Sequence, residues 1–368
     1  MSGATRLVRI GFIGCGNHAT SSLYPTFRLG VTRRTALGEP VGELVACCDL
    51  DEDRARQNAR TFGFERWYTD HRAMLDAERL DCVFVVMPPR LQAPLAVECL
   101  SAGLPVFVEK PATATLEDAC AVRAAGRRSG APLMIGFMKR FSAPYRRARE
   151  LMARPEFGPP TAYEARYNYG RYTPISRYEF LNAFSCHVLD LTRFFMGEVE
   201  QVFASYASRA GAAGGRPKTY AEVLAERELD LPQQEAWLLN LRFASGAAGI
   251  VQTNSLERVQ ERVAVTGVGS WLVVDDWRRV TAYVGDPELP YVYEPNDQVP
   301  SEAMDFRTLH GYTGEVRHFV ECVRDGRVPE PNIEDGIAHL KIELAAKRSA
   351  LENRPVAIAE FAVIAESA

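Results

Sequence analysis

The sequence predicts an α/β protein in which a doubly wound parallel sheet is followed by a second α/β domain with a large, mostly antiparallel open sheet. Three observations support this fold class. Apolar, strand-like runs alternate with helical segments over residues 1–136, whereas the candidate strands of 160–290 alternate apolar and polar residues. In addition, 368 residues exceed what one ordinary hydrophobic core accommodates.

The first part of the chain carries five strand-like runs: "VRIGFIG", "LVACCD", "CVFVVMP", "PVFVEKP" and "PLMIGFM". Helical segments separate them near 17–28 and across 51–62, 93–102 and 115–129. Because these strands are apolar at nearly every position, we expect both faces of the sheet to be buried, as in a parallel βαβ arrangement. The sequence predicts this first domain over residues 1–142.

The remaining residues, 143–368, are predicted to form the second domain. Helices are expected across 181–196, near 312–325 and near 334–352, and "PVAIAEFAVI" is expected to add a closing strand. The small, glycine-rich stretch 209–219 is expected to be a mobile loop.

The composition excludes several classes of function. Net charge is −4, and the sequence has no basic cluster typical of nucleic-acid binding and no apolar run long enough to cross a membrane. The eight cysteines lack the paired spacing of a metal site, and most lie within apolar runs. We therefore expect no metal, no nucleic-acid partner and no membrane insertion, with reduced thiols in a cytoplasmic protein.

A glycine-rich turn follows the first strand. In "GFIGCGNHA", Gly14, Gly16 and Ala19 form a G-x-G-x-x-A pattern between a buried strand and a helix. Such residues allow a tight turn, close approach of a pyrophosphate to the backbone, and packing of helix on strand. The pattern predicts a dinucleotide site of the Rossmann type, with Asn17 and His18 at the start of the helix among the cofactor-binding residues.

The second strand ends in Asp49, which is placed to accept hydrogen bonds from the adenosine ribose of a dinucleotide. A carboxylate there would repel a 2′-phosphate, so Asp49 favours NAD, with NADP as the alternative. Asp49 comes 33 residues after Gly16, whereas about 20 is typical. A loop insertion over 29–42 explains the excess, and its Arg33 and Arg34 are the residues that could instead reach a phosphate.

The strand "LPVFVEKPA" ends in Glu109, Lys110 and Pro111. Ligands of open α/β sheets bind at the carboxyl ends of the strands, so Lys110 is placed to contact both substrate and cofactor. A partly desolvated lysine can exchange protons with a substrate hydroxyl, although a solvated loop lysine is the alternative interpretation.

These motifs together resemble the Gfo/Idh/MocA oxidoreductases, named for glucose–fructose oxidoreductase and inositol dehydrogenase. The resemblance covers nearly the whole chain and depends on "GFIGCGNHA", "CCDLDEDRA", "VVMPPRLQAPLAVECLSAGLPVFVEKP", "GFMKRFSAPYRRARELM", "CHVLDLTRFFMGEVEQV" and "EDGIAHLKIELAAKRSALENRPV". It implies NAD(P)-linked oxidation or reduction of a sugar, sugar derivative or cyclitol. It also implies a homodimer or homotetramer assembled through the C-terminal sheet.

The resemblance further implies roles for individual residues. Lys110 would be the catalytic lysine, preceding a Lys110–Pro111 bond that can be cis. Gln92 stands where the family often has a histidine. The residues that would line the nicotinamide side of the cofactor are Met87, Pro88, Pro89 and Glu109.

His187 lies in the middle of the helical run "LNAFSCHVLDLTRFFMG". On a helix it shares a stripe with Leu191, and Asp190 at i+3 could orient its imidazole, which is also the pattern of a packed core histidine. The resemblance implies instead that His187 faces the substrate and accepts the hydroxyl proton, as the second catalytic residue.

Four nearby residues are candidates for substrate binding besides Lys110 and His187. The family often has an aspartate four residues before the histidine, but this chain has Ala183 there, and the neighbouring Asn182 would point elsewhere on a regular helix. Tyr169 and Arg171 lie upstream, and an arginine would suit an anionic substrate. Ala183 argues against an inositol pocket.

Two other functions remain open from the sequence. A glycosidase that retains NAD would oxidise and re-reduce its sugar transiently. A non-catalytic, dinucleotide-sensing regulator could use the same fold. Retention of Lys110 and His187 argues against the regulator, and Ala183 argues slightly for it.

Overall fold

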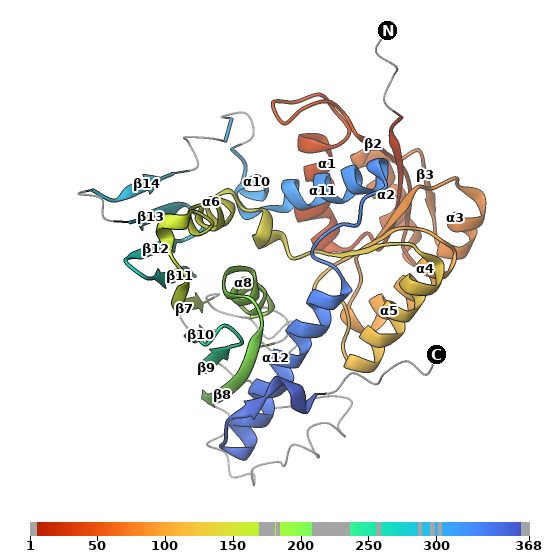
Figure 1. Cartoon of the computed structure of the whole chain (residues 1–368). Coiled ribbons are helices and arrows are strands. Elements are labelled where there is room, and N and C mark those ends of the chain that lie inside the picture. The colour runs from red at the N-terminus through yellow and green to blue at the C-terminus, as the bar shows by residue number, and fades with distance from the viewer. Residues whose placement is uncertain are drawn as a thin grey trace. The chain divides into compact units, whose positions relative to one another are not determined.

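The computed structural model describes residues 6–168, 181, 185–207, 236–254, 259–285, 289–294, 299–300 and 304–361 (Figure 1). The chain forms two compact units. The first comprises Met1–Ser142 with Val299–Ile337, and the second comprises Ala143–Gln298 with Ala338–Val363. The first unit therefore also holds 299–337, a stretch that the sequence assigns to the second domain.

The first unit contains a six-stranded sheet in the order β3-β2-β1-β4-β5-β6, and all of its pairings are parallel. Its strands are β1 (Val8–Ile13), β2 (Gly42–Cys48), β3 (Arg66–Tyr68), β4 (Cys82–Val85), β5 (Val106–Val108) and β6 (Leu133–Ile135). The strand order reverses between β1 and β4, which is the switch point where open α/β sheets bind ligands. The predicted doubly wound sheet is confirmed.

Helices cover both faces of this sheet (Figure 1). They are η1 (Ala19–Leu23), α1 (Tyr24–Gly30), α2 (Glu52–Phe62), α3 (His71–Ala77), α4 (Pro89–Ser101), α5 (Leu116–Ser129), η2 (Met138–Phe141), α10 (Phe306–His310) and α11 (Tyr312–Asp325). Helix α4 packs against α5, whereas α1 packs against α11. The helix predicted near 17–28 begins as the π-helical turn η1.

Helix α11 belongs to the first unit because its apolar side chains complete the core of that unit. Phe84 and Phe107, from β4 and β5, both meet the ring of Phe319 on α11, at centroid distances of 5.2 and 5.8 Å. Val316 and Val320 of the same helix are completely buried. Sequence order alone did not reveal this return of the chain, since an amphipathic helix can cover either sheet.

The second unit contains a nine-stranded sheet in the order β14-β13-β12-β11-β7-β10-β9-β8-β15. Its strands are β7 (Pro160–Asn168), β8 (Val199–Ala207), β9 (Ala236–Phe243), β10 (Ala248–Asn254), β11 (Gln260–Gly267), β12 (Ser270–Asp275), β13 (Arg279–Tyr283), β14 (Tyr291–Tyr293) and β15 (Val356–Ala357). Strands β7 and β10 pair in parallel, and the other described pairings of this sheet are antiparallel. This confirms the predicted mostly antiparallel sheet and the closing strand, while 209–219 lies outside the described residues.

One face of this sheet is covered by α6 (Ala143–Met152), α8 (Cys186–Met196) and α12 (Ile333–Glu352) (Figure 1). Residues such as Trp237, Leu191 and Ile342 form the core between these layers. The opposite face carries exposed large apolar side chains on five strands: Phe203, Leu238, Ile250, Trp271 and Val292. Across the described residues, no helix combines the length and apolar character that a membrane span requires.

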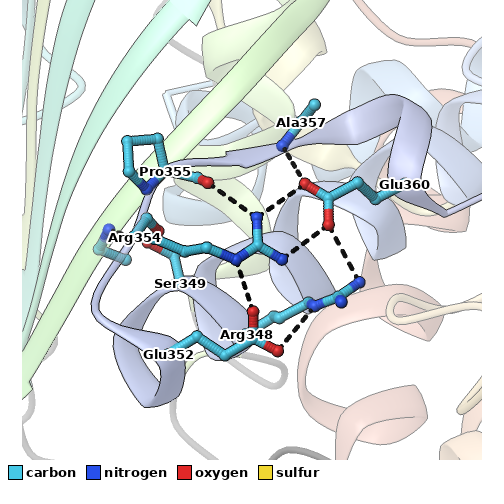
Figure 2. Close-up of polar contacts among 8 residues, drawn as sticks. Arg348, Ser349, Glu352, Arg354, Pro355, Ala357 and Glu360 are labelled. Atoms are coloured by element: carbon cyan, nitrogen blue, oxygen red, sulfur yellow. Dashed lines mark hydrogen bonds and ion pairs between the residues drawn. The ribbon is translucent and has the colours of Figure 1, made fainter.

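The C-terminal strand is held by a cluster of charged side chains (Figure 2). The guanidinium of Arg354 donates to both carboxylate oxygens of Glu360, at 3.0 and 2.8 Å, and to Glu352 at 2.7 Å. Glu360 also accepts from the amide of Ala357 in β15, at 3.0 Å. Hydrogen bonds from Arg354 and Ala357 lower the pKa of Glu360 to about 2.

The substitution Glu360→Gln is expected to loosen β15 while leaving the core of the unit intact. Because the pKa of Glu360 is lower in the folded chain, its stabilising effect is complete above the ordinary carboxyl pKa and is lost as pH falls towards 2. The protection factors of the Val356 and Ala357 amides, which correct the exchange rate for its intrinsic dependence on pH, should therefore fall in acid in the natural chain and be low already at neutral pH in the variant. Unchanged exchange in the variant would contradict this assignment.

Candidate active site

The glycine-rich turn lies at the carboxyl end of β1, at the switch point of the sheet. Gly14 has a φ of +102°, and a Cβ on it would lie 2.2 Å from the carbonyl oxygen of Val86. Gly16 differs, since among the described residues, its own chain neighbours apart, no heavy atom lies within 4 Å of where its Cβ would be. Gly14 is therefore required by the fold itself, whereas the space beside Gly16 is left open, as pyrophosphate approach demands.

Asp49 organises the same turn from the end of β2. Its Oδ2 accepts from the amide of Cys15 at 2.9 Å, and its Oδ1 accepts from the amide of Asp51 at 3.0 Å. The guanidinium of Arg54, on α2, lies 3.2 Å from Oδ1. Sequence reasoning missed Arg54, although its position one turn into the helix after Asp49 was a usable signal. Arg34, in contrast, pairs with Glu39 within its own loop.

The loop after β4 lies beside the glycine turn. Met87 is adjacent to Gly14, because its sulfur would lie 2.9 Å from a Cβ placed there. Pro88 and Pro89 then begin α4. Gln92, in the first turn of that helix, is completely buried and donates to the carbonyl oxygens of Glu109 and Pro111, both at 2.8 Å. Its amide thus fixes the backbone on both sides of Lys110.

Lys110 follows β5 and precedes a cis peptide bond to Pro111, as the resemblance implied. The neighbouring Glu109 is 4% exposed, and its Oε2 accepts from the amide of Lys110 at 3.0 Å. His18 Nε2 lies 3.0 Å from the other carboxylate oxygen, forming an ion pair when the imidazole is protonated. The structure therefore brings His18, Glu109 and Lys110 together beside the glycine turn.

The pKa of Glu109 is lowered in this cluster. Burial is the largest influence and acts to raise it, but the positive charges of His18 and Lys110, with their hydrogen bonds, together outweigh burial. The lowered pKa favours the ionised form of the Glu109 carboxyl group. Its buried charge is compensated, as a carboxylate in such surroundings requires.

His187 belongs to the second unit, where it is the second residue of α8 and is 4% exposed. Its ring lies 6.0 Å from that of Tyr167 on β7, centroid to centroid. Asp190, one turn further along α8, is 1% exposed. The substrate-binding candidates Tyr169, Arg171, Asn182 and Ala183 lie outside the described residues.

Comparison with known protein families finds a match for each half of the chain. Residues 8–137 match the Gfo/Idh/MocA oxidoreductase family in its NAD-binding Rossmann fold, and residues 149–358 match the C-terminal alpha/beta domain of that family. The chain belongs to the Gfo/Idh/MocA oxidoreductases. The turn at Gly14 and Gly16 and the residue Asp49 lie within the part of the chain that matches this NAD-binding domain.

Three curated relatives to which the chain is similar are dehydrogenases by name. The chain is 26% identical over 327 residues to scyllo-inositol 2-dehydrogenase (NAD(+)) of Bacillus subtilis, with 86% of this chain and 89% of the relative covered. It is 27% identical to Myo-inositol 2-dehydrogenase of Thermotoga maritima, with 86% and 91% covered. It is 26% identical to D-apiose dehydrogenase of Paraburkholderia graminis, with 85% and 82% covered.

Solved structures share the fold. An oxidoreductase from Agrobacterium radiobacter, in complex with NAD+, L-tartaric acid and magnesium, superposes with a TM-score of 0.80 at 18% identity, covering 96% of this chain and 99% of that one. Aldose-aldose oxidoreductase from Caulobacter crescentus gives a TM-score of 0.76 at 22% identity, with 96% and 100% covered.

The substitution Asp49→Ser is expected to weaken NAD binding roughly tenfold and to shift the preference towards NADP. The variant would lose the expected ribose acceptor and one of the two carboxylates that pair with Arg54, which leaves the guanidinium better able to meet a 2′-phosphate. Fluorescence titration with each dinucleotide measures the ratio of dissociation constants. The matched control is Asp51→Ser, since Asp51 pairs with the same Arg54 and serine retains its capping role on α2. An unchanged NAD/NADP ratio in Asp49→Ser would show that this carboxylate does not select the cofactor.

Proposed function

We propose that this Gfo/Idh/MocA protein is an NAD-dependent dehydrogenase of a sugar, sugar derivative or cyclitol, with NADP as the alternative cofactor. The observation that carries the proposal is the cluster of Lys110, Glu109 and His18 at the carboxyl end of β5, beside a glycine turn that fits a dinucleotide. The three curated relatives named above oxidise compounds of these classes according to their names.

Bound NAD would supply the hydride acceptor in the oxidation direction. The residues that would hold it are Gly14, Gly16, Asn17, His18 and Asp49 on one side, and Met87, Pro88, Pro89 and Glu109 on the other. The ammonium group of Lys110 orients the substrate and polarises its reacting oxygen. Gln92 fixes the backbone on both sides of this lysine through the carbonyl oxygens of Glu109 and Pro111. His187 removes the hydroxyl proton, and Asp190 orients its imidazole.

The substrate is proposed to differ from inositol. Ala183 replaces the carboxylate that the family often places four residues before the histidine, so one acceptor for substrate hydroxyls is missing. Arg171 and Tyr169 suit a sugar acid or another anionic sugar derivative, with Asn182 as a further contact. A screen of polyols, aminosugars, uronates and inositols with NAD and NADP, read as NADH or NADPH absorbance, tests both the activity and the substrate class.

The two alternatives predict different outcomes in the same screen. A glycosidase that retains NAD would release an aglycone with no net change in NADH absorbance. A regulator would bind dinucleotide without turnover of any compound. The curated relatives reported above are dehydrogenases and support neither alternative.

We also propose a homodimer or homotetramer assembled through the outer face of the nine-stranded sheet. Phe203, Leu238, Ile250, Trp271 and Val292 are each at least 38% exposed there. An apolar patch of this kind marks an interaction surface. Light scattering of the purified protein measures the oligomeric state, and a monomer at all concentrations would overturn this proposal. We also propose a cytoplasmic location, because seven of the eight cysteines are buried without a disulfide partner and reduced cysteines are usual in that compartment.

A further inference from the structure

The helix-covered face of the nine-stranded sheet changes from apolar to polar at one end. Across β9, β10, β7 and β11, one set of register partners is entirely apolar: Leu239, Val251, Ala165 and Val263. Two residues away on each strand, the register partners all carry a polar side-chain atom: Trp237, Thr253, Tyr167 and Glu261. These four residues, the polar row, are each at most 5% exposed. Register partners share one side of a sheet, so the polar row forms a continuous strip across it.

The polar row lies against the start of α8. Ser185, which directly precedes this helix, places its hydroxyl 2.9 Å from that of Thr253. The ring of Tyr167 lies 6.0 Å from that of His187, centroid to centroid. Glu261 is the register partner of Tyr167, so it lies one strand spacing, about 4.8 Å, to the side of the tyrosine that faces His187. Aromatic rings combined with a few buried polar groups are typical of a small-molecule site.

Glu261 is the charged member of the polar row. The hydroxyl of Tyr145, on α6, donates to Oε1 of Glu261 at 2.5 Å. Burial, the largest cause, and the charge of Glu261 raise the pKa of Tyr145, so this hydroxyl remains a donor. A carboxylate can accept several hydrogen bonds, and one from Tyr145 is compatible with another from a ligand. Burying a carboxylate costs free energy that an apolar side chain such as Val263 would not, so Glu261 requires an explanation beyond packing.

A strained turn holds the backbone of Glu261. Asp276 and Trp277 have φ values of +47° and +48°, and the turn is closed by the amide of Arg278, which donates to the carbonyl oxygen of Asp275 at 3.1 Å. Glycine or asparagine is usual at such positions, and a bulky tryptophan is a clear exception. The amide of Asp276 donates to the carbonyl oxygen of Glu261 at 2.6 Å, and its Oδ1 accepts from the Glu261 amide at 3.2 Å. Strain of this kind is concentrated at functional sites.

We propose that Glu261 is a substrate-binding residue whose carboxylate accepts a hydrogen bond from a substrate hydroxyl other than the one that is oxidised. This role rests on the dehydrogenase function proposed above. It supplies from the sheet the acceptor that is missing at Ala183. A site built to bond a hydroxyl rejects an analogue that lacks it, so Glu261 selects polyhydroxylated substrates that carry this second hydroxyl in the correct position.

The test uses Glu261→Gln, whose side-chain carbonyl can still accept from Tyr145 but whose amide turns a donor towards the ligand. The matched control is Glu150→Gln, at an exposed partner of Arg147 on the helix that carries Tyr145. Ligand-observed NMR measures binding of the polyols, aminosugars, uronates and inositols of the screen. The measurement is made with NADH present, because NADH cannot accept a hydride and the compounds are therefore not oxidised.

We expect at least one compound to bind the natural chain and Glu150→Gln equally, with its Kd raised roughly tenfold or more in Glu261→Gln. Equal dissociation constants in all three proteins would overturn the proposal. So would the absence of binding by every compound in the panel.

Monodeoxy analogues of the compound that binds best separate a direct contact from an effect on the fold. For one analogue, the one that lacks the hydroxyl bonded by Glu261, the ratio of Kd in Glu261→Gln to Kd in the natural chain should fall to about one. A ratio that stays the same for every analogue would overturn the proposal. Should Glu261→Gln fail to fold, Glu261→Asp keeps the charge but withdraws the carboxylate by one methylene group, and the same comparison decides.

Turnover tests the proposed function separately. Compounds that bind through Glu261 but are never oxidised would contradict the dehydrogenase function and leave this binding role standing. Oxidation of a compound whose binding does not depend on Glu261 would do the reverse.

Discussion

Replacing Lys110 by alanine is expected to reduce turnover by roughly a thousandfold, within the range typical for loss of a proton-transferring group. The truncation removes the ammonium group but leaves the backbone that Gln92 fixes through the carbonyls of Glu109 and Pro111. The glycine turn and Asp49 are also untouched. NAD should therefore bind with nearly its normal dissociation constant, so the defect should appear in kcat far more than in cofactor affinity.

The measurement pairs steady-state kinetics on a substrate found by the screen with fluorescence titration of NAD. Lys341→Ala, at a partly exposed lysine of α12, controls for the loss of one positive charge. Near-normal turnover in Lys110→Ala would refute the catalytic role. Loss of NAD binding together with turnover would instead assign Lys110 to the cofactor site.

The sequence predicted the parts of this site that depend on local pattern. A strand, a glycine turn and a helix are contiguous in the chain, so Gly14 and Gly16 are recognisable from the order of residues alone. The same holds for Lys110, because the carboxyl end of a buried strand is a defined place in a parallel sheet. Short, partly exposed elements were not predicted. Strand β3 has three residues and helix α3 has seven, which are too few to establish a periodic pattern of apolar residues.

Contacts between distant segments were not predictable from local pattern. Tyr145 and Glu261 are 116 residues apart in the sequence, and only the packing of α6 in the second unit brings their side chains into contact. The alternating pattern of β11 nevertheless held a usable signal, since a glutamate at a buried strand position requires an explanation. Gln92 is a similar case. Its role depends on two carbonyl partners, which lie 17 and 19 residues further along the chain and beyond the reach of a local pattern.

Gly16→Ala is expected to leave the stability of the fold nearly unchanged but to weaken NAD binding at least tenfold, which is roughly 1.4 kcal/mol of binding free energy. Apart from its chain neighbours, no heavy atom of the part of the chain that the structure describes would lie within 4 Å of the added methyl group, so the fold has room for it. The same methyl group would enter the space through which the pyrophosphate approaches the backbone.

Gly14→Ala is the matched comparison, because it places the same methyl group two residues away in the same turn. Its Cβ would lie 2.2 Å from the carbonyl oxygen of Val86, at a φ of +102° that residues other than glycine rarely adopt. We expect this variant to unfold at a distinctly lower temperature. Thermal unfolding and NAD titration of both variants separate the two roles, since a fold requirement lowers Tm and a ligand requirement raises Kd at constant Tm. If Gly16→Ala bound NAD as tightly as the natural chain, the open space beside Gly16 would have to serve something other than the dinucleotide.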